Sequence, residues 1–318
     1  MFTLAHLSDP HLPPLRSPRL KDLVTKRFYG HQSWIRRRRF IHRREVVDKM
    51  IEDIQRARVD HVAITGDLVN IATEAEFVGA AEWLAQVGTP DRVTLVPGNH
   101  DAYVPVAFEK GIGLWQDYFT SDLSLGRMHA DDSPFPFVRT RRNVALIGLS
   151  TALPTPPLVA SGTLGAIQLH RLGEILAALK ERGFFRVVLI HHPPLPGMNS
   201  PRKALTDASA FREVIEREGA EIVLHGHNHE HSMRQVFSAS GHAYVLGVPS
   251  ASALPRHGKP AAAWYLYRIG RAKGAWQCDV TVRSYNETKG QFEETEAFAL
   301  DLSPDLEQPR DPVLVPAG

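Results

Sequence analysis

Cysteine is nearly absent from this sequence, since Cys278 is the only one among 318 residues. A single cysteine excludes an internal disulfide and fits a reducing compartment. No apolar stretch approaches the roughly 20 residues that a membrane-spanning helix needs. The first apolar segment, Phe2–Leu7, is short and lacks the basic start of a cleaved signal peptide. We therefore expect a cytoplasmic protein.

Charge of one sign is also scarce, because the formal net charge is only +2. This balance gives no overall attraction to a polyanion, so nucleic acid is not expected as a partner. With 43% hydrophobic residues the chain can bury a large core. We assign residues 1–302 to one α/β domain and residues 303–318 to a proline-rich tail. The sequence carries no indication of oligomeric state.

Short runs of Val, Ile and Leu without helical periodicity predict buried strands at 2–7, 59–65, 92–96, 143–149, 186–190 and 221–224. Segments with a period near 3.6 predict helices at 43–58, 73–87, 104–119, 166–182 and 207–218. This alternation is typical of βαβ units. Five later strand-like segments, at 232–238, 242–248, 262–269, 276–284 and 291–300, are expected to form a second sheet.

Polar clusters follow five of the apolar runs in a fixed order. They are Asp9-Pro10-His11, Gly66-Asp67, Gly98-Asn99-His100-Asp101, His191-His192-Pro193-Pro194 and Gly226-His227-Asn228-His229. Each alone could be an ordinary turn after a strand. Together they place carboxylate, amide and imidazole donors at the carboxyl ends of strands, where open α/β sheets build their sites. This mixture of oxygen and nitrogen donors suits Mn, Fe, Zn or Co.

The spacing within the clusters fits metal binding. Asp9 and His11 are two residues apart, so in extended backbone they point the same way, and Pro10 stiffens the turn between them. Asp67 follows a glycine, and its two carboxylate oxygens can bridge two cations. Two ions a few Å apart form a clamp for displacement at phosphorus.

In this order, over residues 1–250, the clusters resemble the calcineurin-like metallophosphoesterase superfamily. The residues of these motifs are most similar to those of its bacterial class III cyclic-nucleotide phosphodiesterase branch. The resemblance implies an α/β fold, a four-layer αββα sandwich of two mixed sheets flanked by helices, with a dinuclear metal site at the strand carboxyl ends. It implies two divalent transition-metal ions, one held by Asp9, His11, Asp67 and His229, the other by Asp67, Asn99, His191 and His227.

The resemblance also implies roles beside the metals. His191 follows its strand directly and is taken as the ligand, with His192 behind it or facing the substrate. His100 is expected to stabilise the leaving group, with Asp101 orienting its imidazole. His225, at the end of a predicted strand, is expected to be a packed, hydrogen-bonded core histidine.

The implied activity is metal-dependent hydrolysis of a phosphoric ester. A small phosphodiester or cyclic nucleotide is the leading substrate, attacked by a hydroxide that the metals activate. One alternative is a phospholipid or sugar-lipid diphosphate hydrolase at the membrane surface. Another is a scaffold on the same fold, which the complete ligand set disfavours.

Residues 16–44 form a basic excursion after the first cluster. They contain Arg36-Arg37-Arg38-Arg39, Arg43 and Arg44 among several aromatic residues. Three interpretations stay open: a solvated face, a clamp on a polyanionic substrate, or a patch over Arg36–Arg44 that binds anionic lipid and holds the protein at the membrane periphery. The loop 195–206 offers Arg202 and Lys203 as candidate substrate contacts, or is an ordinary polar connection.

Overall fold

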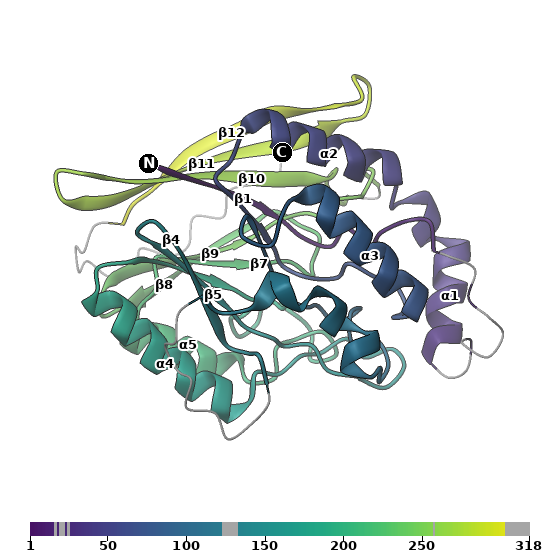
Figure 1. Cartoon of the computed structure of the whole chain (residues 1–318), viewed down its shortest axis with the longest axis horizontal. Coiled ribbons are helices and arrows are strands. Elements are labelled where there is room, and N and C mark those ends of the chain that lie inside the picture. Colours follow the sequence, from purple (N-terminus) through teal and green to yellow (C-terminus); the bar gives the residue numbers. More distant parts are fainter. Residues whose placement is uncertain (16–17, 19–22, 24–25, 123–132, 257, 303–318) are drawn as a thin grey trace.

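The structure is a computed structural model that describes residues 1–15, 18, 23, 26–122, 133–256 and 258–302. The expected tail, 303–318, and most of 16–25 in the basic excursion lie outside the described residues. Within the described part, twelve strands form two six-stranded sheets (Figure 1).

The first sheet has the order β12-β11-β10-β1-β2-β3. Its strands β1, β2 and β3 are parallel, and β10 joins β1 in the antiparallel direction and begins a meander to β12. The bounds are β1 (Phe2–Leu7), β2 (His61–Ile64), β3 (Val93–Leu95), β10 (Ala263–Ala272), β11 (Ala275–Asn286) and β12 (Gln291–Leu300).

The second sheet has the order β4-β5-β6-β7-β9-β8. Its four central strands are parallel, and β4 and β8 are antiparallel edges. The bounds are β4 (Phe137–Arg141), β5 (Val144–Gly148), β6 (Phe185–Leu189), β7 (Ile222–His225), β8 (Ser232–Ser238) and β9 (Gly241–Gly247).

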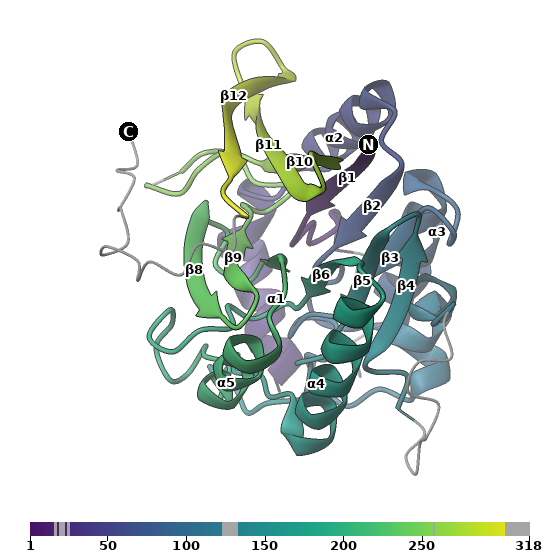
Figure 2. The same cartoon turned by 90° about the vertical axis from the view of Figure 1, so that its left-hand side faces the viewer.

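Side chains alternate between two cores because successive residues of a strand face opposite sides of a sheet. In β6, Val187 and Leu189 belong to the core shared by the two sheets, and Val188 belongs to the core beneath the second sheet. Leu4 of β1 lies in the shared core as well. The sheets therefore pack face to face, which confirms the predicted inner layers (Figure 2).

Helices cover the outer faces of both sheets, as predicted. Apolar residues of α2 and α3 belong to the same continuous cluster as the shared core, on the outer side of the first sheet, and those of α4 and α5 belong to the second cluster. A capping box between Thr73 and Glu76 begins α3. The bounds are α1 (Lys26–Arg36), α2 (Arg44–Ala57), α3 (Glu74–Val87), α4 (Gly165–Glu181) and α5 (Ala208–Glu218), with the 3₁₀ turns η2 (Arg38–Phe40), η3 (Phe108–Lys110) and η4 (Ile112–Phe119).

Two predictions about the elements are wrong. The strands after residue 224 do not form a sheet of their own: β8 and β9 extend the second sheet, and β10 to β12 extend the first. The segment 104–119 forms 3₁₀ turns in place of a regular helix. Gly111 and Gly113 interrupt it, and a Cβ at Gly113 would lie 2.4 Å from the carbonyl oxygen of Phe108.

Three elements were not predicted, namely β4, α1 and the short 3₁₀ turn η2. In α1 the buried residues are Lys26, Gly30 and Trp34, whereas Phe28 and Tyr29 are exposed. The helix therefore lacks the inward apolar stripe from which a helix is predicted. No helix in the described part of the chain has the length and apolar character to cross a membrane.

Candidate metal centre

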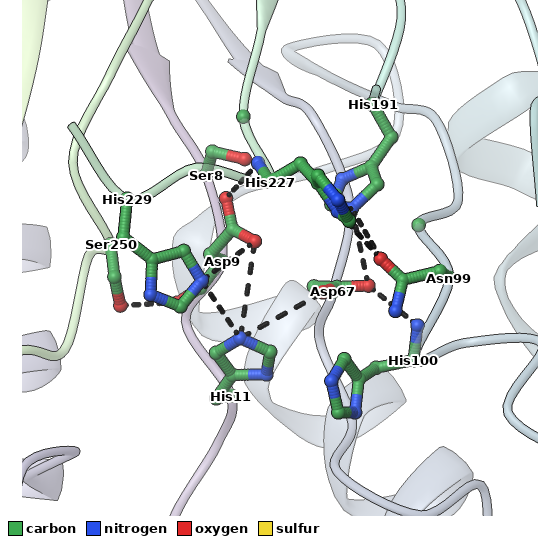
Figure 3. Close-up of polar contacts among 12 residues, drawn as sticks. Ser8, Asp9, His11, Asp67, Asn99, His100, His191, His227, His229 and Ser250 are labelled. Carbon is green, nitrogen blue, oxygen red and sulfur yellow. Dashed lines mark hydrogen bonds and ion pairs between the residues drawn. The ribbon is translucent and has the colours of Figure 1, made fainter. Parts of the chain in front are cut away.

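The five polar clusters follow the carboxyl ends of parallel strands from both sheets. Figure 3 shows that their side chains turn toward one another. Each cluster begins within two residues of a strand end or directly after a short loop from it, so strand order fixes where the donors lie. Strands β1, β2 and β3 supply Asp9, His11, Asp67, Asn99 and His100, and strands β6 and β7 supply His191, His227 and His229.

One group of donors is formed by Asp9, His11 and His229. The Nε2 atom of His229 lies 3.2 Å from Asp9 Oδ1 and 3.2 Å from His11 Nε2. His11 Nε2 is 3.9 Å from the same Asp9 oxygen. The other Asp9 oxygen accepts a hydrogen bond of 2.9 Å from the backbone N–H of His227, which fixes the carboxylate plane.

A second group is formed by Asn99, His191 and His227. The amide oxygen of Asn99 lies 2.8 Å from His227 Nδ1 and 3.1 Å from His191 Nε2. The two imidazole nitrogens are 3.2 Å apart. Three donor atoms from three strand ends therefore converge on one point.

Asp67 lies between the two groups. Its Oδ2 is 3.8 Å from His11 Nε2, and its Oδ1 is 3.5 Å from His191 Nε2. One carboxylate thus offers an oxygen to each group, which is the geometry that a bridging ligand requires. The structure brings together all seven residues that the sequence suggests as metal ligands.

The hydrogen bonds behind the imidazoles direct their lone pairs into the site. His11 donates from Nδ1 to the carbonyl oxygen of Val69 at 3.3 Å, and His191 donates from Nδ1 to that of Thr65 at 2.6 Å. Each ring then presents an unprotonated Nε2 to the other donors. Burial lowers the pKa of His11, His191 and His227, so the rings are neutral, which is the form that binds metals.

The carboxylates also fit cations. Burial raises the pKa of Asp67 well above its usual range, and the neighbouring charges of Asp9 and Asp101 raise it further. A cation between Asp9 and Asp67 would offset this repulsion. The donor set therefore fits two divalent ions, with Asp67 shared between them.

The backbone of the site is held in a conformation that side chains rarely adopt. Asp9, His11, Asp67, His227 and His229 all have positive φ, between 39° and 70°. Such strain is typical of functional sites, where surrounding structure holds the residue in place.

Glycines permit the close approach of the clusters. A Cβ on Gly98 would lie 2.3 Å from Asp67 Oδ1, and one on Gly226 would lie 2.4 Å from Asp9 Oδ2. Only glycine fits at these positions, because a methyl group would displace the ligand carboxylate.

Asp101 differs from its expected role. Its carboxylate accepts four backbone N–H groups, from Asp67, Leu68, Val69 and Gly98, at 2.8 to 3.1 Å. Asp101 therefore ties the turn after β2 to the turn after β3, and it holds Asp67 in position through the backbone. The expectation that it orients the imidazole of His100 is wrong.

His100 is instead oriented by the carbonyl oxygen of Asn70, to which its Nδ1 donates at 2.5 Å. Its backbone N–H donates to Asp67 Oδ1 at 2.7 Å. Tyr103 stacks on the ring, with centroids 5.2 Å apart and planes inclined by 13°. His100 is thus fixed beside the bridging carboxylate, in a position to meet a group that leaves the phosphorus.

Arg38 is a site residue that the sequence did not single out. Its Nη1 lies 3.3 Å from His100 Nε2, and Asp67 and Asp9 are its acidic neighbours. The other arginines of the run, Arg36, Arg37 and Arg39, are exposed. The run of four arginines was the only signal, and a run cannot show which member turns inward.

His42 is a second unpredicted neighbour. Its ring lies 4.8 Å from that of His11 and 5.8 Å from that of His229, and the three offer ligand atoms within 4.8 Å of one another. The Nδ1 atom of His42 forms a hydrogen bond of 2.7 Å with Ser252 Oγ. The basic excursion therefore contributes both a cation and an imidazole to the edge of the site.

The three candidate substrate residues do not take part in the donor set. His192 is fully buried. Its Nδ1 forms a hydrogen bond of 2.6 Å with Thr151 Oγ1, and its Nε2 forms one of 3.0 Å with the carbonyl oxygen of Ala160. It therefore packs behind His191 and does not face a substrate. Arg202 and Lys203 are exposed, and among the described residues neither side chain contacts the ligand set. His225 is buried and hydrogen-bonded to Gly226 and Ser232, as predicted.

A fold of two packed mixed sheets with such a donor set defines a metal-dependent hydrolase of phosphoric esters. The chain belongs to the calcineurin-like phosphoesterase family, whose model matches residues 2–231. The family depends on a dinuclear metal centre, and the two donor groups around Asp67 are the candidate ligands here.

Solved structures share the fold at low sequence identity. A dimetal phosphatase from Danio rerio is 14% identical with a TM-score of 0.60, over 95% of this chain and 99% of that one. Purple acid phosphatase PPD1 from yellow lupin (Lupinus luteus) seeds is 12% identical with a TM-score of 0.54, over 94% of this chain and 53% of that one. Sulfate thiohydrolase SoxB from Thermus thermophilus is 17% identical with a TM-score of 0.52, over 92% of this chain and 58% of that one. A search of curated protein sequences found no match.

Proposed function

We propose that this protein is a phosphodiesterase that hydrolyses small phosphodiesters, cyclic nucleotides among them. The observation that carries the proposal is the position of Asp67, whose two oxygens face separate donor groups while its Oδ1 also accepts the N–H of His100. Two divalent ions held there would polarise the phosphoryl oxygens and lower the pKa of a water between them. The motifs GNHD and GHNH resemble those of the cyclic-nucleotide branch. This resemblance supports a diester substrate over a monoester substrate.

The protein's own residues would position the ester. Arg38 would donate to a phosphoryl oxygen, and His100 would meet the oxygen that leaves. Because Nδ1 of His100 is committed to the Asn70 carbonyl, Nε2 is the atom that faces the substrate. No serine or cysteine nucleophile is needed, and the only cysteine, Cys278, is buried in β11.

A substrate panel tests the proposal. The Mn-loaded protein would be assayed with bis-p-nitrophenyl phosphate, p-nitrophenyl phosphate, cyclic nucleotides, glycerophosphodiesters and lipid diphosphates. We expect kcat/KM to be highest for the diesters, and Asp67→Asn, prepared in parallel, to report any contaminating hydrolase. A preference for the monoester would refute the diesterase assignment and leave the phosphoester hydrolase intact.

A second candidate is hydrolysis of a phospholipid or a sugar-lipid diphosphate. It is supported by the aromatic side chains of Phe28 and Tyr29, which are exposed on α1, and by the exposed arginines that end this helix and follow it, Arg36, Arg37 and Arg39. In the panel above, this candidate predicts that lipid diphosphates exceed the soluble diesters in kcat/KM.

A further inference from the structure

The basic excursion has two different faces. Its inner face packs against the metal centre: Lys26, Gly30 and Trp34 of α1 are buried, and a Cβ on Gly30 would lie 2.6 Å from Ile71 and 2.8 Å from the Tyr103 hydroxyl. Tyr103 in turn stacks on His100. The helix is therefore held tightly beside the site, and its other face points outward at the periphery of the molecule (Figure 1).

The outer face is apolar at positions where a soluble helix is normally polar. Phe28 is 47% exposed, Tyr29 57%, Ile35 37% and, in the following turn η2, Phe40 51%. Phe28 and Ile35 are seven residues apart, as are Tyr29 and Arg36, so each pair shares one side of the helix. Four large exposed apolar side chains within one short segment form a patch of the kind that marks an interaction surface.

The arginines beside this patch lack acidic partners. Among the described residues, the side chains of Arg36 and Arg37 have no ion pair and no hydrogen bond, and Arg39 lies over the ring of Phe40 at 4.7 Å. The next two arginines are neutralised: Arg43 pairs with Glu45 at 2.6 Å and Arg44 with Asp48 at 2.8 Å. Within this run of arginines, the residues without an acidic partner among the described residues are therefore those next to the exposed aromatic side chains.

We propose that Phe28, Tyr29, Ile35, Arg36, Arg37, Arg39 and Phe40 form a docking surface for an anionic phospholipid bilayer. Aromatic and aliphatic side chains on one side of a helix, flanked by arginines, match the acyl boundary and the phosphate headgroups of such a surface. Each cation near an anionic bilayer contributes about 1 kcal/mol of binding, screened by salt. The sequence predicted a patch over Arg36–Arg44. The proposed surface ends at Phe40, because Arg43 and Arg44 form ion pairs with acidic residues.

Docking in this way would place His100 and Arg38, which lie on the inner side of the same segment, near the membrane. Lipid-linked phosphoesters would then be within reach, and that consequence rests on the proposed function. The docking itself does not, because it involves none of the metal ligands.

Vesicle sedimentation tests the docking surface with the full chain. Wild-type protein should sediment with vesicles of phosphatidylcholine mixed with phosphatidylglycerol, and much less with phosphatidylcholine alone or at high salt. The variant Arg36→Gln/Arg37→Gln/Arg39→Gln should lose about 10²-fold in partitioning. Phe28→Ser/Tyr29→Ser/Phe40→Ser should also bind more weakly. The altered side chains of both variants are exposed. Both should therefore hydrolyse bis-p-nitrophenyl phosphate at the wild-type rate, which would confirm that they fold.

A matched control removes three cations from elsewhere on the surface, as Lys180→Gln/Arg182→Gln/Arg234→Gln. It should retain vesicle binding, because Lys180 lies in the last turn of α4, Arg182 directly follows that helix and Arg234 lies on β8, all away from the patch. An equal loss in this control would show that net charge alone drives binding and would overturn the proposal. Wild-type protein that fails to sediment, or patch variants that sediment normally, would overturn it as well.

Two further arms keep the interpretation specific. Single-stranded RNA is offered in competition with the vesicles; if the patch variants lose RNA binding and the wild type prefers RNA, the surface binds nucleic acid and the lipid proposal fails. Asp67→Asn, expected to lack hydrolysis, should still bind anionic vesicles. Failure of catalysis and failure of docking are thus separately visible.

Discussion

The guanidinium of Arg38 lies against the imidazole of His100, with Nη1 3.3 Å from Nε2 and 3.4 Å from Nδ1. Nearly equal distances to both nitrogens indicate a contact with the ring in place of one directed hydrogen bond. Burial, together with the charge of Arg38, holds the pKa of His100 well below its usual range. A negatively charged substrate would offset the charge of Arg38 and make protonation of His100 easier.

The first prediction concerns Arg38. Arg38→Gln should lower kcat/KM for phosphodiesters by about 10- to 100-fold, because a hydrogen bond to a charged group contributes about 1.5–3 kcal/mol. Arg38→Lys should restore only part of this loss, since an ammonium lacks the planar fork. Arg37→Gln is the matched control, because Arg37 is an exposed neighbour in the same run. Steady-state kinetics on the soluble diester decide, and equal effects at both positions would contradict the assignment.

The second prediction separates metal binding from leaving-group assistance. His100→Gln should retain both metal ions yet lower kcat by about 10²–10⁴, most strongly for poor leaving groups. Metal analysis of the purified variant and a series of aryl and alkyl diesters would measure this. If the loss is the same for activated and unactivated esters, His100 only positions the substrate.

The third prediction concerns the shared ligand. Asp67→Ala removes an oxygen from each donor group, so the variant should lose metal stoichiometry and turnover together. Chelation of the wild type should abolish hydrolysis, and added Mn should restore it in the wild type alone. Asp117→Ala, an exposed aspartate in η4, is the control. Normal metal content in Asp67→Ala would refute the bridging role.

The positions of the ligands could be predicted from the sequence because each cluster directly follows a buried strand. Parallel strands bring their carboxyl ends to one edge, so Asp9, Asp67 and Asn99 had to lie close together once β1, β2 and β3 were recognised. The pairing of the later strands could not be predicted in this way. Strand β10 joins β1 across most of the chain, and no local pattern encodes so distant a partner.

The remaining errors have one physical origin, which is that residue type does not reveal orientation. A carboxylate next to a histidine can orient the ring or accept backbone N–H groups, and Asp101 does the latter. His191 and His192 are adjacent and chemically identical, yet only His191 presents a free nitrogen to the site. Arg38 lies in the 3₁₀ turn η2 and contacts His100, and no local pattern in the sequence predicts that turn.

The fourth prediction is a pH effect at Lys26. Its ammonium donates to Thr155 Oγ1 at 2.7 Å and lies over the ring of Tyr103, and burial lowers its pKa from 10.5 to about 8. Between these two values the unfolded chain binds more protons than the folded protein, so the stability contributed by Lys26 rises with pH. The unfolding free energy of the wild type minus that of Lys26→Met should therefore increase from pH 8 to pH 10.5. Urea denaturation measures it, with Lys180→Met as the exposed control, and a flat difference would contradict the prediction.

The last prediction concerns stability away from the site. Asp53 of α2 is buried, accepts two hydrogen bonds from Arg283 at 2.6 and 2.8 Å, and accepts a third from the indole of Trp264 at 3.0 Å. This carboxylate ties α2 to β10 and β11. Asp53→Ala leaves Arg283 and the Trp264 N–H without their acceptor, and breaking such a buried pair costs about 3 kcal/mol of unfolding free energy.

Urea denaturation should show this loss as a lower midpoint with an unchanged slope. Metal content should be unchanged, because Asp53 contacts none of the ligands. Asp279→Ala, an exposed aspartate of β11, should unfold like the wild type. If Asp53→Ala matched Asp279→Ala in stability, the network would be dispensable, and the attachment of α2 to the first sheet would have to come from the buried apolar side chains of the helix, Val46, Val47, Met50, Ile51 and Ile54.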